Sequence, residues 1–448
     1  MISMMSSRFD GCCDGNLLKE KISVRPQPLE GLEQLGELLA AERLADGLKE
    51  IFIPNQFTVD FIMEVAGRAR AYSAEKFDTE AHYLSSVYNP PEAEAFPICL
   101  TGLAGVGKSQ TIKALRKVLP GPVSLTIDHF EGAHTLLSHW YASARGKAGG
   151  RQLLADFLGD EVSKSRINAA KLLVECRRRA NRDGVSLVIL EEMQHISTGQ
   201  GASKVTDLLL TMSGIGIPMV YVANYSLVHK LLSRNSEDKQ RLLAEPRVML
   251  PDTPDCEVWK EYIRECVRVS NNRISADTDA LADEIYRGTF GIKRLAVQLI
   301  KLAYVEARAA GRRKVELEDV HHAYLSTSYS VNRVDIEELH RQAIQKRRTG
   351  PRTDLLCPFG VPMKSNVIQF ARSDRDERVI SKVFVSSLTA EERSGFKELN
   401  PIGTVSSPEP IKRPKRAPIP KPTDEDLANA FNQLLEENPS APKPRRPS

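Results

Sequence analysis

GLAGVGKS, residues 102–109, fills every fixed position of the pattern G-x-x-x-x-G-K-[ST]. The apolar residues 96–100 before it predict a buried strand, and residues 111–118 after it predict a helix. Between a strand and a helix, such a loop turns its backbone N–H groups toward phosphate oxygens, and the helix dipole adds positive charge. We therefore predict an ATP site with Lys108 on the β and γ phosphates and the Ser109 hydroxyl on Mg²⁺. The residues expected to contact ATP here are Gly102, Gly105, Gly107, Lys108, Ser109 and Gln110.

Two carboxylates form the second half of the expected site. The apolar run 185–190 predicts a buried strand, and Glu191 and Glu192 follow it directly. An acid at such a strand end orders Mg²⁺ through its water shell, and the next acid polarises the attacking water. We assign Glu191 to Mg²⁺ and Glu192 to water activation. The alternative is that the pair is only a solvated strand end.

Polar residues at three later points complete the expected ATP site. Asn224 ends an apolar run and can orient the attacking water near the γ phosphate. Arg241 and Arg247 lie just before the next expected strand, where an arginine can reach a neighbouring subunit's site and stabilise charge on the transferred phosphate. Arg294, in the sequence Gly-Ile-Lys-Arg, can bend back onto the γ phosphate. Taken singly, each arginine can equally be a surface charge.

Composition narrows the class of protein. The chain has 448 residues, enough for two or three domains, and a net charge of only +4, so any nucleic-acid surface must be local. The 7 cysteines show no zinc spacing, and nothing requires an oxidising compartment. The N-terminus lacks a signal-peptide core, and no apolar run approaches the roughly 18 residues of a membrane helix. We expect a cytoplasmic protein without a membrane partner.

The order of patterns along the chain predicts an α/β core followed by helices. Strands are expected at 97–101, 123–127, 185–190, 218–222 and 248–250, alternating with helices as in a parallel five-stranded sheet. From residue 349 onward we expect weaker order. The expected segments are a flexible N-terminus (1–25), a helical segment (26–92), an α/β ATPase core (93–252), a helical lid (253–330), a C-terminal extension (331–404) and a tail rich in Pro, Lys and Arg (405–448).

The tail contains one short amphipathic pattern. Residues 411–422 are rich in proline and cations, which prevents a packed core. Residues 424–437 then carry an apolar stripe at helical spacing, made of Leu427, Ala430, Phe431, Leu434 and Leu435. A short helix in such a tail cannot bury its own stripe, so we expect it to dock into a partner's groove. The alternative is that it folds back on its own domain.

A basic, glycine-rich segment is the candidate DNA contact. Residues 143–151 read SARGKAGGR and supply Arg145, Lys147 and Arg151. We place the segment in a loop after the second strand, where its cations can contact phosphates independently of sequence and with strong salt dependence. The alternative is an exposed loop without a ligand.

The order of phosphate loop, acid pair, strand-end Asn, arginine and Gly-x-x-Arg resembles that of the AAA+ ATPases. Residues 190–195, LEEMQH, look like the (D/E)-E-x-Q-H stretch of the TnsC/TniB transposition regulators. Residues 216–224 resemble the strand that carries their sensor Asn, and Phe52-Ile-Pro resembles the segment that approaches adenine. The likeness covers roughly residues 45–330. Glu191 stands where Asp is commoner, which leaves the rate of hydrolysis open.

The resemblance implies an AAA+ P-loop NTPase with a parallel five-stranded sheet, a small helical lid and a flexible C-terminal tail. Proteins of this type bind ATP and Mg²⁺ at subunit interfaces and form homo-oligomeric rings or helical filaments on double-stranded DNA. They link a target-selection protein of TniQ type to transposase subunits, which the tail would bind here. ATP hydrolysis then controls disassembly.

Two other functions remain open from the sequence. An AAA+ helicase loader or origin-binding ATPase predicts a DNA-binding domain such as a winged helix after the lid, and residues 333–448 show none. A signalling ATPase switch, in which nucleotide controls a partner without DNA, predicts no DNA-stimulated assembly.

Overall fold

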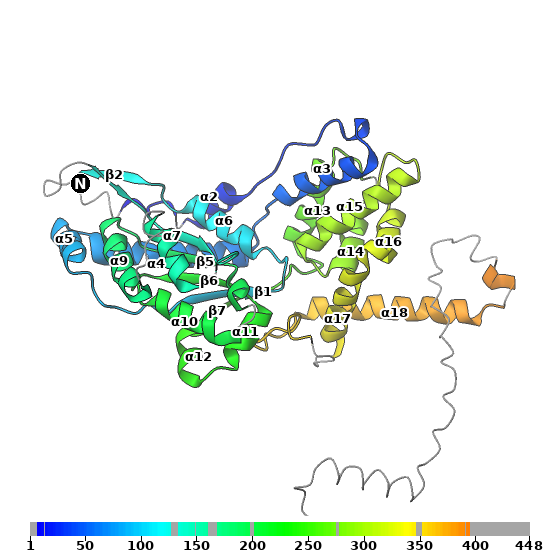
Figure 1. Cartoon of the computed structure of the whole chain (residues 1–448). Coiled ribbons are helices and arrows are strands. Elements are labelled where there is room, and N and C mark those ends of the chain that lie inside the picture. Colours follow the sequence, from blue (N-terminus) through cyan, green and yellow to red (C-terminus); the bar gives the residue numbers. More distant parts are fainter. Residues whose placement is uncertain are drawn as a thin grey trace, which may run out of the picture. The chain divides into compact units, whose positions relative to one another are not determined.

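The computed structural model describes residues 7–12, 14–126, 133–147, 149–159, 168–197, 201–274, 277–345, 352–389 and 391–394. The chain divides into two compact units, Met1–Gly395 and Phe396–Ser448. The predicted tail helix 424–437 lies outside the described residues, and the fold below is that of the first unit (Figure 1).

A five-stranded parallel sheet organises the ATPase core, as the sequence predicts. Its strand order is β4-β5-β6-β1-β7. β1 and β5 are buried along their whole length, which fits parallel strands covered by helices on both faces. The strands are β1 (Ile98–Gly102), β4 (Trp140–Ser143), β5 (Val188–Glu191), β6 (Met219–Asn224) and β7 (Glu245–Met249).

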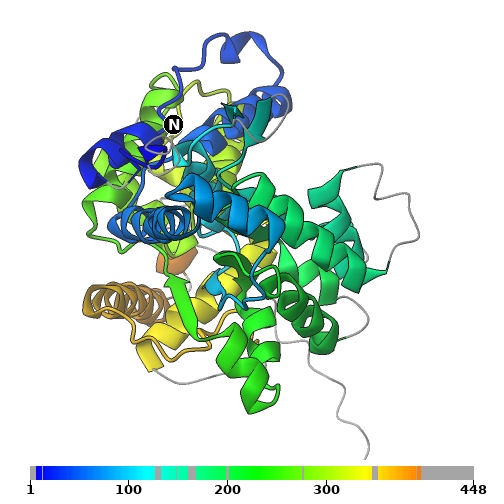
Figure 2. The same ribbon diagram turned by 90° about the vertical axis from the view of Figure 1, so that its left-hand side faces the viewer.

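Two layers of helices cover the sheet. On one face, α2 (Gly15–Ile22), α4 (Gln56–Phe77) and α6 (Lys108–Val118) contact one another and pack on Ile98 and Leu100 of β1 (Figures 1 and 2). On the other face, the apolar side chains of four helices surround Cys99 and Leu190. These helices are α7 (Gly150–Leu158), α9 (Ala169–Arg182), α10 (Gly201–Ser213) and α11 (Tyr225–Leu232).

A separate hydrophobic core holds the helical lid together. Trp259, fully buried, stacks on Tyr262, and both pack with the apolar side chains of α3 from the N-terminal segment. The N-terminal helices therefore divide between two cores, since α3 packs in the lid and α4 on the sheet. The helices of this core are α3 (Glu37–Glu50), α13 (Glu257–Val269), α14 (Thr278–Thr289), α15 (Lys293–Ala309) and α16 (Leu317–Leu325).

The remaining elements are short or flank these cores. They are η1 (Leu32–Gln34), α5 (Glu80–Tyr88), η2 (Met193–Ser197), α12 (Ser236–Leu242), η3 (Thr327–Tyr329), α17 (Ser330–Gln345) and α18 (Ser365–Ser387). In the described part of the chain, no helix is long and apolar enough to cross a membrane.

The predicted second strand forms, but the prediction that it belongs to the parallel sheet was wrong. β2 (Val123–Thr126) pairs antiparallel with β3 (Ala133–Leu136) in a separate ribbon. Of the residues of β2, only Leu125 is buried, and such alternation suits a half-solvated antiparallel ribbon. The fifth strand of the parallel sheet is instead β4, at its edge beside β5.

The expectation of weak order after residue 349 is wrong for α18. This helix buries only Val367, Ala371 and Asp374, spaced along one side of its first half. Asp374 forms ion pairs with Arg287 of α14 at 2.7 Å and with Arg378 of its own helix at 3.0 Å. Because few of its residues are apolar and buried, α18 shows little of the apolar periodicity by which a helix is predicted from sequence.

Candidate nucleotide site

The phosphate loop has the backbone that its glycines predict. Gly105 and Gly107 have φ angles of 83° and 120°, which favour glycine. The loop also leaves no room for a side chain, because a Cβ on Gly105 would lie 2.8 Å from the Arg294 guanidinium nitrogen Nε. Gly107 is the N-cap of α6, so the N–H groups of the first turn face the loop.

Lys108 is buried at the start of α6 and bonds to its own loop. Its Nζ donates hydrogen bonds of 2.8 Å to the carbonyl oxygens of Gly102 and Leu103. Burial is the main reason why the pKa of Lys108 is lowered to about 8, and Arg294 adds to this while Glu192 opposes it. A bound phosphate would place a negative charge beside this buried ammonium and favour its protonated form.

A cavity of about 630 Å³ opens over the loop and gathers most of the predicted site. Phosphate-loop residues line it together with Glu192 just after β5, Asn224 at the end of β6 and Arg294 from the lid. Apolar side chains line its other side and suit a nucleobase. The predicted residues that line it are Gly105, Gly107, Lys108, Ser109, Gln110, Glu192, Asn224 and Arg294, and the base-side residues include Leu48, Ile51, Phe52, Tyr262 and Val297.

The parallel register explains why distant residues meet at this cavity. Gly102, the last residue of β1, pairs with Asn224 at the end of β6. Glu191 ends β5, next to β6. Parallel strands bring their carboxyl ends to one edge of a sheet, where ligands of open α/β folds bind. Asn224 is the N-cap of α11 but makes no side-chain hydrogen bond to that helix, and it lines the cavity.

Glu191 is buried at the end of β5 and does not line the cavity. Its Oε2 accepts a 2.7 Å hydrogen bond from the Tyr141 hydroxyl, while its buried Oε1 has no hydrogen-bond partner. Burial raises the pKa of Glu191, and the hydroxyls of Tyr141 and Ser109 oppose that rise. Burial also raises the pKa of Tyr141 to about 12, so its hydroxyl keeps its proton and donates.

Glu192 points into the cavity from an unusual backbone position. Its φ of 58° lies in the left-handed region, which is uncommon for a residue other than glycine and clusters at functional sites. Its Oε2 accepts a 2.6 Å hydrogen bond from Gln194 and lies 3.0 Å from the His195 Nε2. The Gln-His pair is therefore in direct contact with the predicted catalytic carboxylate.

The residues expected to hold Mg²⁺ fit that ion. Mg²⁺ takes oxygen ligands and is usually bound by one or two carboxylates, substrate phosphates and water. Glu191 offers an unpaired buried oxygen, and the Ser109 hydroxyl lies at the cavity. Across the described residues, no cluster of three or more His, Cys, Asp or Glu side chains forms a separate metal cage.

Arg294 and Lys293 join the lid to the phosphate loop. The backbone N–H of Arg294 donates to the Gly105 carbonyl at 3.3 Å. Lys293, which the sequence analysis did not single out, also lines the cavity and pairs with Asp252 at 3.1 Å. Its position beside Arg294 was the available signal, since consecutive cations begin the same helix.

The two predicted arginine fingers lie outside the cavity of their own chain. Arg241, on α12, is 41% exposed and pairs with Glu94 at 3.4 Å and Glu237 at 3.1 Å. Arg247 lies inside β7, not before it as predicted, and makes two hydrogen bonds to Glu64 at 2.8 and 2.6 Å.

The described residues of the basic segment 143–151 begin at Ser143, the last residue of β4, and end in the first turn of α7. The segment was predicted to follow the second strand, but it adjoins β4, and Arg151 lies in that first turn. Arg145 and Arg151 are exposed, while Lys147 pairs with Asp156 at 2.9 Å. None of the three lines the nucleotide cavity.

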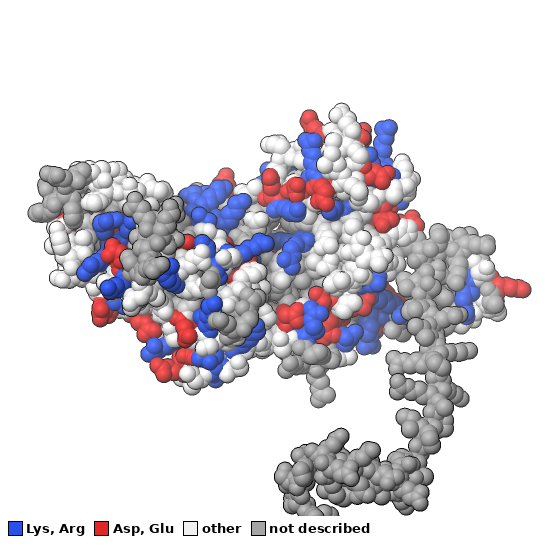
Figure 3. All heavy atoms as spheres, viewed as in Figure 1, with Lys and Arg blue, Asp and Glu red and all other residues white. Residues whose placement is uncertain are grey.

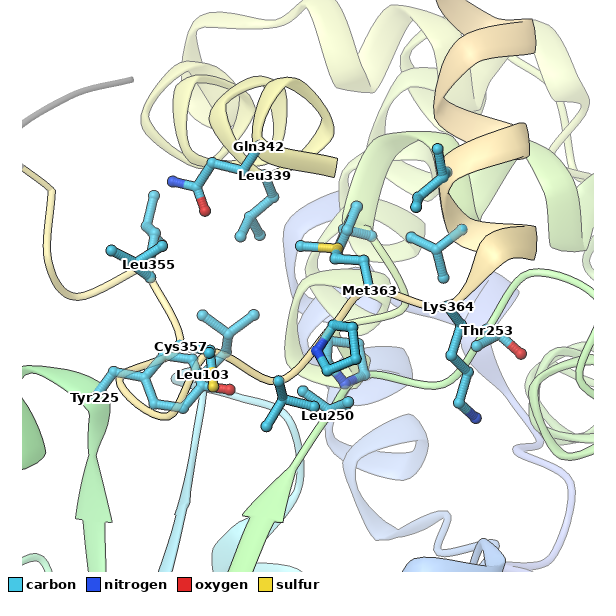
Figure 4. A pocket seen from close by; sticks show the side chains of 18 of the residues that line it. Leu103, Tyr225, Leu250, Thr253, Leu339, Gln342, Leu355, Cys357, Met363 and Lys364 are labelled. Atoms are coloured by element: carbon cyan, nitrogen blue, oxygen red, sulfur yellow. The ribbon is translucent and has the colours of Figure 1, made fainter. Parts of the chain in front are cut away.

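A second cavity contains none of the predicted site residues (Figure 4). Its volume is about 380 Å³, and its lining is mainly apolar. Leu103 comes from the phosphate loop just after β1, Tyr225 begins α11 and Leu339 lies on α17. Leu355 and Met363 come from the segment before α18. The cavity therefore lies where the C-terminal extension covers the ATPase core.

Comparison with known proteins identifies the domain around the phosphate loop. Residues 94–231 match the family model described as an AAA domain. No curated protein matches the chain.

Several solved structures are similar to this chain at low identity. The Orc1 protein of Aeropyrum pernix in complex with DNA is 17% identical over 72% of this chain and 81% of that chain, with a TM-score of 0.35. Drosophila ORC bound to DNA is 15% identical over 83% of this chain and 92% of that chain, with a TM-score of 0.38. The Thermotoga maritima RuvB Holliday junction branch migration motor is 13% identical over 70% of this chain and 87% of that chain, with a TM-score of 0.33.

The AAA match spans the strands that carry the loop and both acids. Residues 94–231 accordingly form an AAA domain with the P-loop fold, and the chain is an ATPase.

Proposed function

We propose that this ATPase is a regulator of DNA transposition that assembles on duplex DNA. In this proposal, the oligomer links a target-selection protein of TniQ type to a transposase, and ATP hydrolysis ends the assembly. The observation that carries the proposal is the contact of Gln194 and His195 with Glu192. The residues that resemble the TnsC/TniB stretch thus act directly on the expected catalytic carboxylate.

The positions of the two arginines support an oligomer. A finger must reach phosphate, and neither Arg241 nor Arg247 lines the cavity of its own chain. Arg241 suits a neighbour's site better, because it is the more exposed and its ion pairs are weak surface contacts. Arg247 is committed to Glu64 by two hydrogen bonds. We therefore assign Arg241 as the finger.

Two groups of cations are available for DNA. The first is Arg145, Lys147 and Arg151, which lie just beyond β4 and hence at the same edge of the sheet as the nucleotide cavity. The second gathers over α6, where Lys113, Arg116 and Lys117 are exposed (Figure 3). We keep the first group as the DNA contact, since that position lets ATP binding influence it.

The role of the tail rests on the sequence alone. Deleting residues 418–448 is expected to leave ATP and DNA binding intact and to abolish recruitment of the transposase. Loss of ATP binding on this deletion would contradict a docking role for the tail.

An origin-binding ATPase or helicase loader is the second candidate. A winged helix after the lid would favour it, but the described residues after 330 form α17 and α18 and contain no strand. Such a wing is therefore missing from the described part of the extension.

The experiment that tests the proposal is sedimentation and negative-stain microscopy of the purified chain with duplex DNA. ATP, a nonhydrolysable analogue and ADP are compared at one salt concentration, because DNA affinity depends on salt. Rings or filaments that need both DNA and a triphosphate support the proposal. An assembly state that does not change on addition of DNA with any of the three nucleotides would favour a signalling switch instead.

A further inference from the structure

Tyr141 on β4 reaches across to the acid of the neighbouring strand. In the parallel register, Tyr141 pairs with Ile189 and Ser143 pairs with Glu191. Residues two apart on a strand lie on the same face of the sheet, so the Tyr141 side chain is a diagonal neighbour of Glu191. Its hydroxyl donates the 2.7 Å hydrogen bond to Glu191 Oε2.

The Tyr141 ring is itself held from the other side. The guanidinium of Arg116, in the last turn of α6, lies 3.9 Å from the centre of the ring. A cation at this distance from an aromatic face is attracted by the negative charge of that face. The hydroxyl is thus fixed between a strand, a cation and a carboxylate.

The hydrogen bond leaves the other carboxylate oxygen available. Glu191 Oε1 is buried and has no hydrogen-bond partner, which is costly unless a ligand completes it. Glutamate also has one more rotatable bond than the aspartate that is commoner here, so it needs an additional restraint to present that oxygen in one place.

We propose that Tyr141 is a positioning residue that fixes the Glu191 carboxylate and aims its free oxygen at the water shell of Mg²⁺. The proposal rests on the assignment of Glu191 to Mg²⁺. It adds a residue that no phosphate-loop motif contains.

The test measures nucleotide affinity with and without Mg²⁺. A fluorescent ATP analogue is titrated into the full chain in EDTA and in saturating Mg²⁺, and the ratio of the two Kd values is the gain from Mg²⁺. Tyr141→Phe is expected to lower this gain roughly tenfold, as loss of a partner of a metal ligand does, while affinity in EDTA stays unchanged. The readout is binding, so it does not depend on turnover.

Tyr83→Phe is the matched control. Tyr83 also donates a short hydrogen bond, of 2.6 Å, but to the Arg182 carbonyl, and Tyr83 does not line the nucleotide cavity. Its loss is expected to leave the gain from Mg²⁺ unchanged. If Tyr141→Phe weakens binding equally in EDTA and in Mg²⁺, Tyr141 only supports the fold and the proposal is wrong.

A second variant tests whether Tyr141 acts through Glu191. In Glu191→Asp the carboxylate is drawn back from the hydroxyl, so adding Tyr141→Phe is expected to change the gain by less than about twofold. An equal loss in both backgrounds would overturn the proposal. Failure of the parent chain to bind nucleotide even in saturating Mg²⁺ would instead contradict the ATP site itself, which keeps the two failures distinct.

Discussion

The nucleotide cavity and the basic segment 143–151 lie at the same edge of one sheet, yet they differ in how far the chain completes them. The cavity gathers residues from the phosphate loop, two strands and the lid. The basic segment presents Arg145 and Arg151 to solvent and pairs Lys147 with Asp156. The nucleotide site is thus formed largely by the backbone and strand ends of a single chain, whereas the cations of the basic segment lie outside that cavity.

The largest effect is expected from removing the Lys108 cation, which should weaken the nucleotide site and leave the basic segment in place. Lys108→Ala is expected to lower affinity for ATP about a hundredfold, because the buried ammonium would make charge-assisted hydrogen bonds to a bound phosphate. DNA-dependent assembly should disappear with it. Fluorescent-nucleotide titration and sedimentation measure the two effects.

Lys113→Ala is the control for this variant, since Lys113 is exposed on the same helix. It should bind ATP as the parent chain does. Unchanged assembly in Lys108→Ala would show that nucleotide does not control the oligomer.

The basic segment is tested by removing its three cations together. The triple variant Arg145→Ala, Lys147→Ala, Arg151→Ala is expected to weaken DNA binding about tenfold or more with a nonhydrolysable analogue present. The slope of log affinity against log salt should fall by about two to three, because each phosphate contact contributes about 0.9. Affinity for ATP should stay the same.

Lys113→Ala with Lys117→Ala is the matched variant on α6. If this pair loses DNA affinity and the triple variant keeps it, the DNA surface lies over α6, and the proposed contact at 143–151 is wrong.

The smallest expected effect is a pH dependence of the cavity. Burial lowers the pKa of Lys108 from its ordinary 10.5 to about 8. Between these values the unfolded chain binds more protons than the folded one, so the free energy of unfolding rises with pH while the charge that attracts phosphate is lost. Nucleotide affinity in EDTA should therefore fall above pH 8, by less than about tenfold per pH unit.

Titration of the fluorescent nucleotide from pH 7 to 9.5 measures this effect. A flat affinity across that range would mean that Lys108 keeps its charge in the folded chain.

Much of the site could be predicted because its chemistry depends on backbone. The glycines at 105 and 107 adopt φ angles of 83° and 120°, and the parallel register then places Asn224 beside Gly102. Four of the five parallel strands were predicted near their observed positions. The signal was clearest for β1 and β5, because fully buried strands read as continuous apolar runs.

The rest depends on contacts between segments that no local pattern encodes. β4 was missed because it is only four residues long and its sequence, with two buried residues, Trp140 and Ala142, is too short to show a clear alternation of apolar and polar residues. Tyr141 and Lys293 were missed as site residues because their roles come from a neighbouring strand and from the docking of the lid. Arg247 was placed before β7 since strand ends are the least certain part of such a prediction.

The central claim is that a neighbour's Arg241 completes the ATP site, and mixing two inactive variants tests it most directly. Glu192→Gln removes water activation and keeps the arginine, while Arg241→Ala keeps the carboxylate and loses the arginine. Each alone should hydrolyse ATP at least about a hundredfold more slowly on DNA. An equal mixture should recover about a quarter of the parent rate, because a quarter of randomly formed interfaces join an intact carboxylate to an intact arginine. A mixture no faster than the two variants measured separately would contradict the claim.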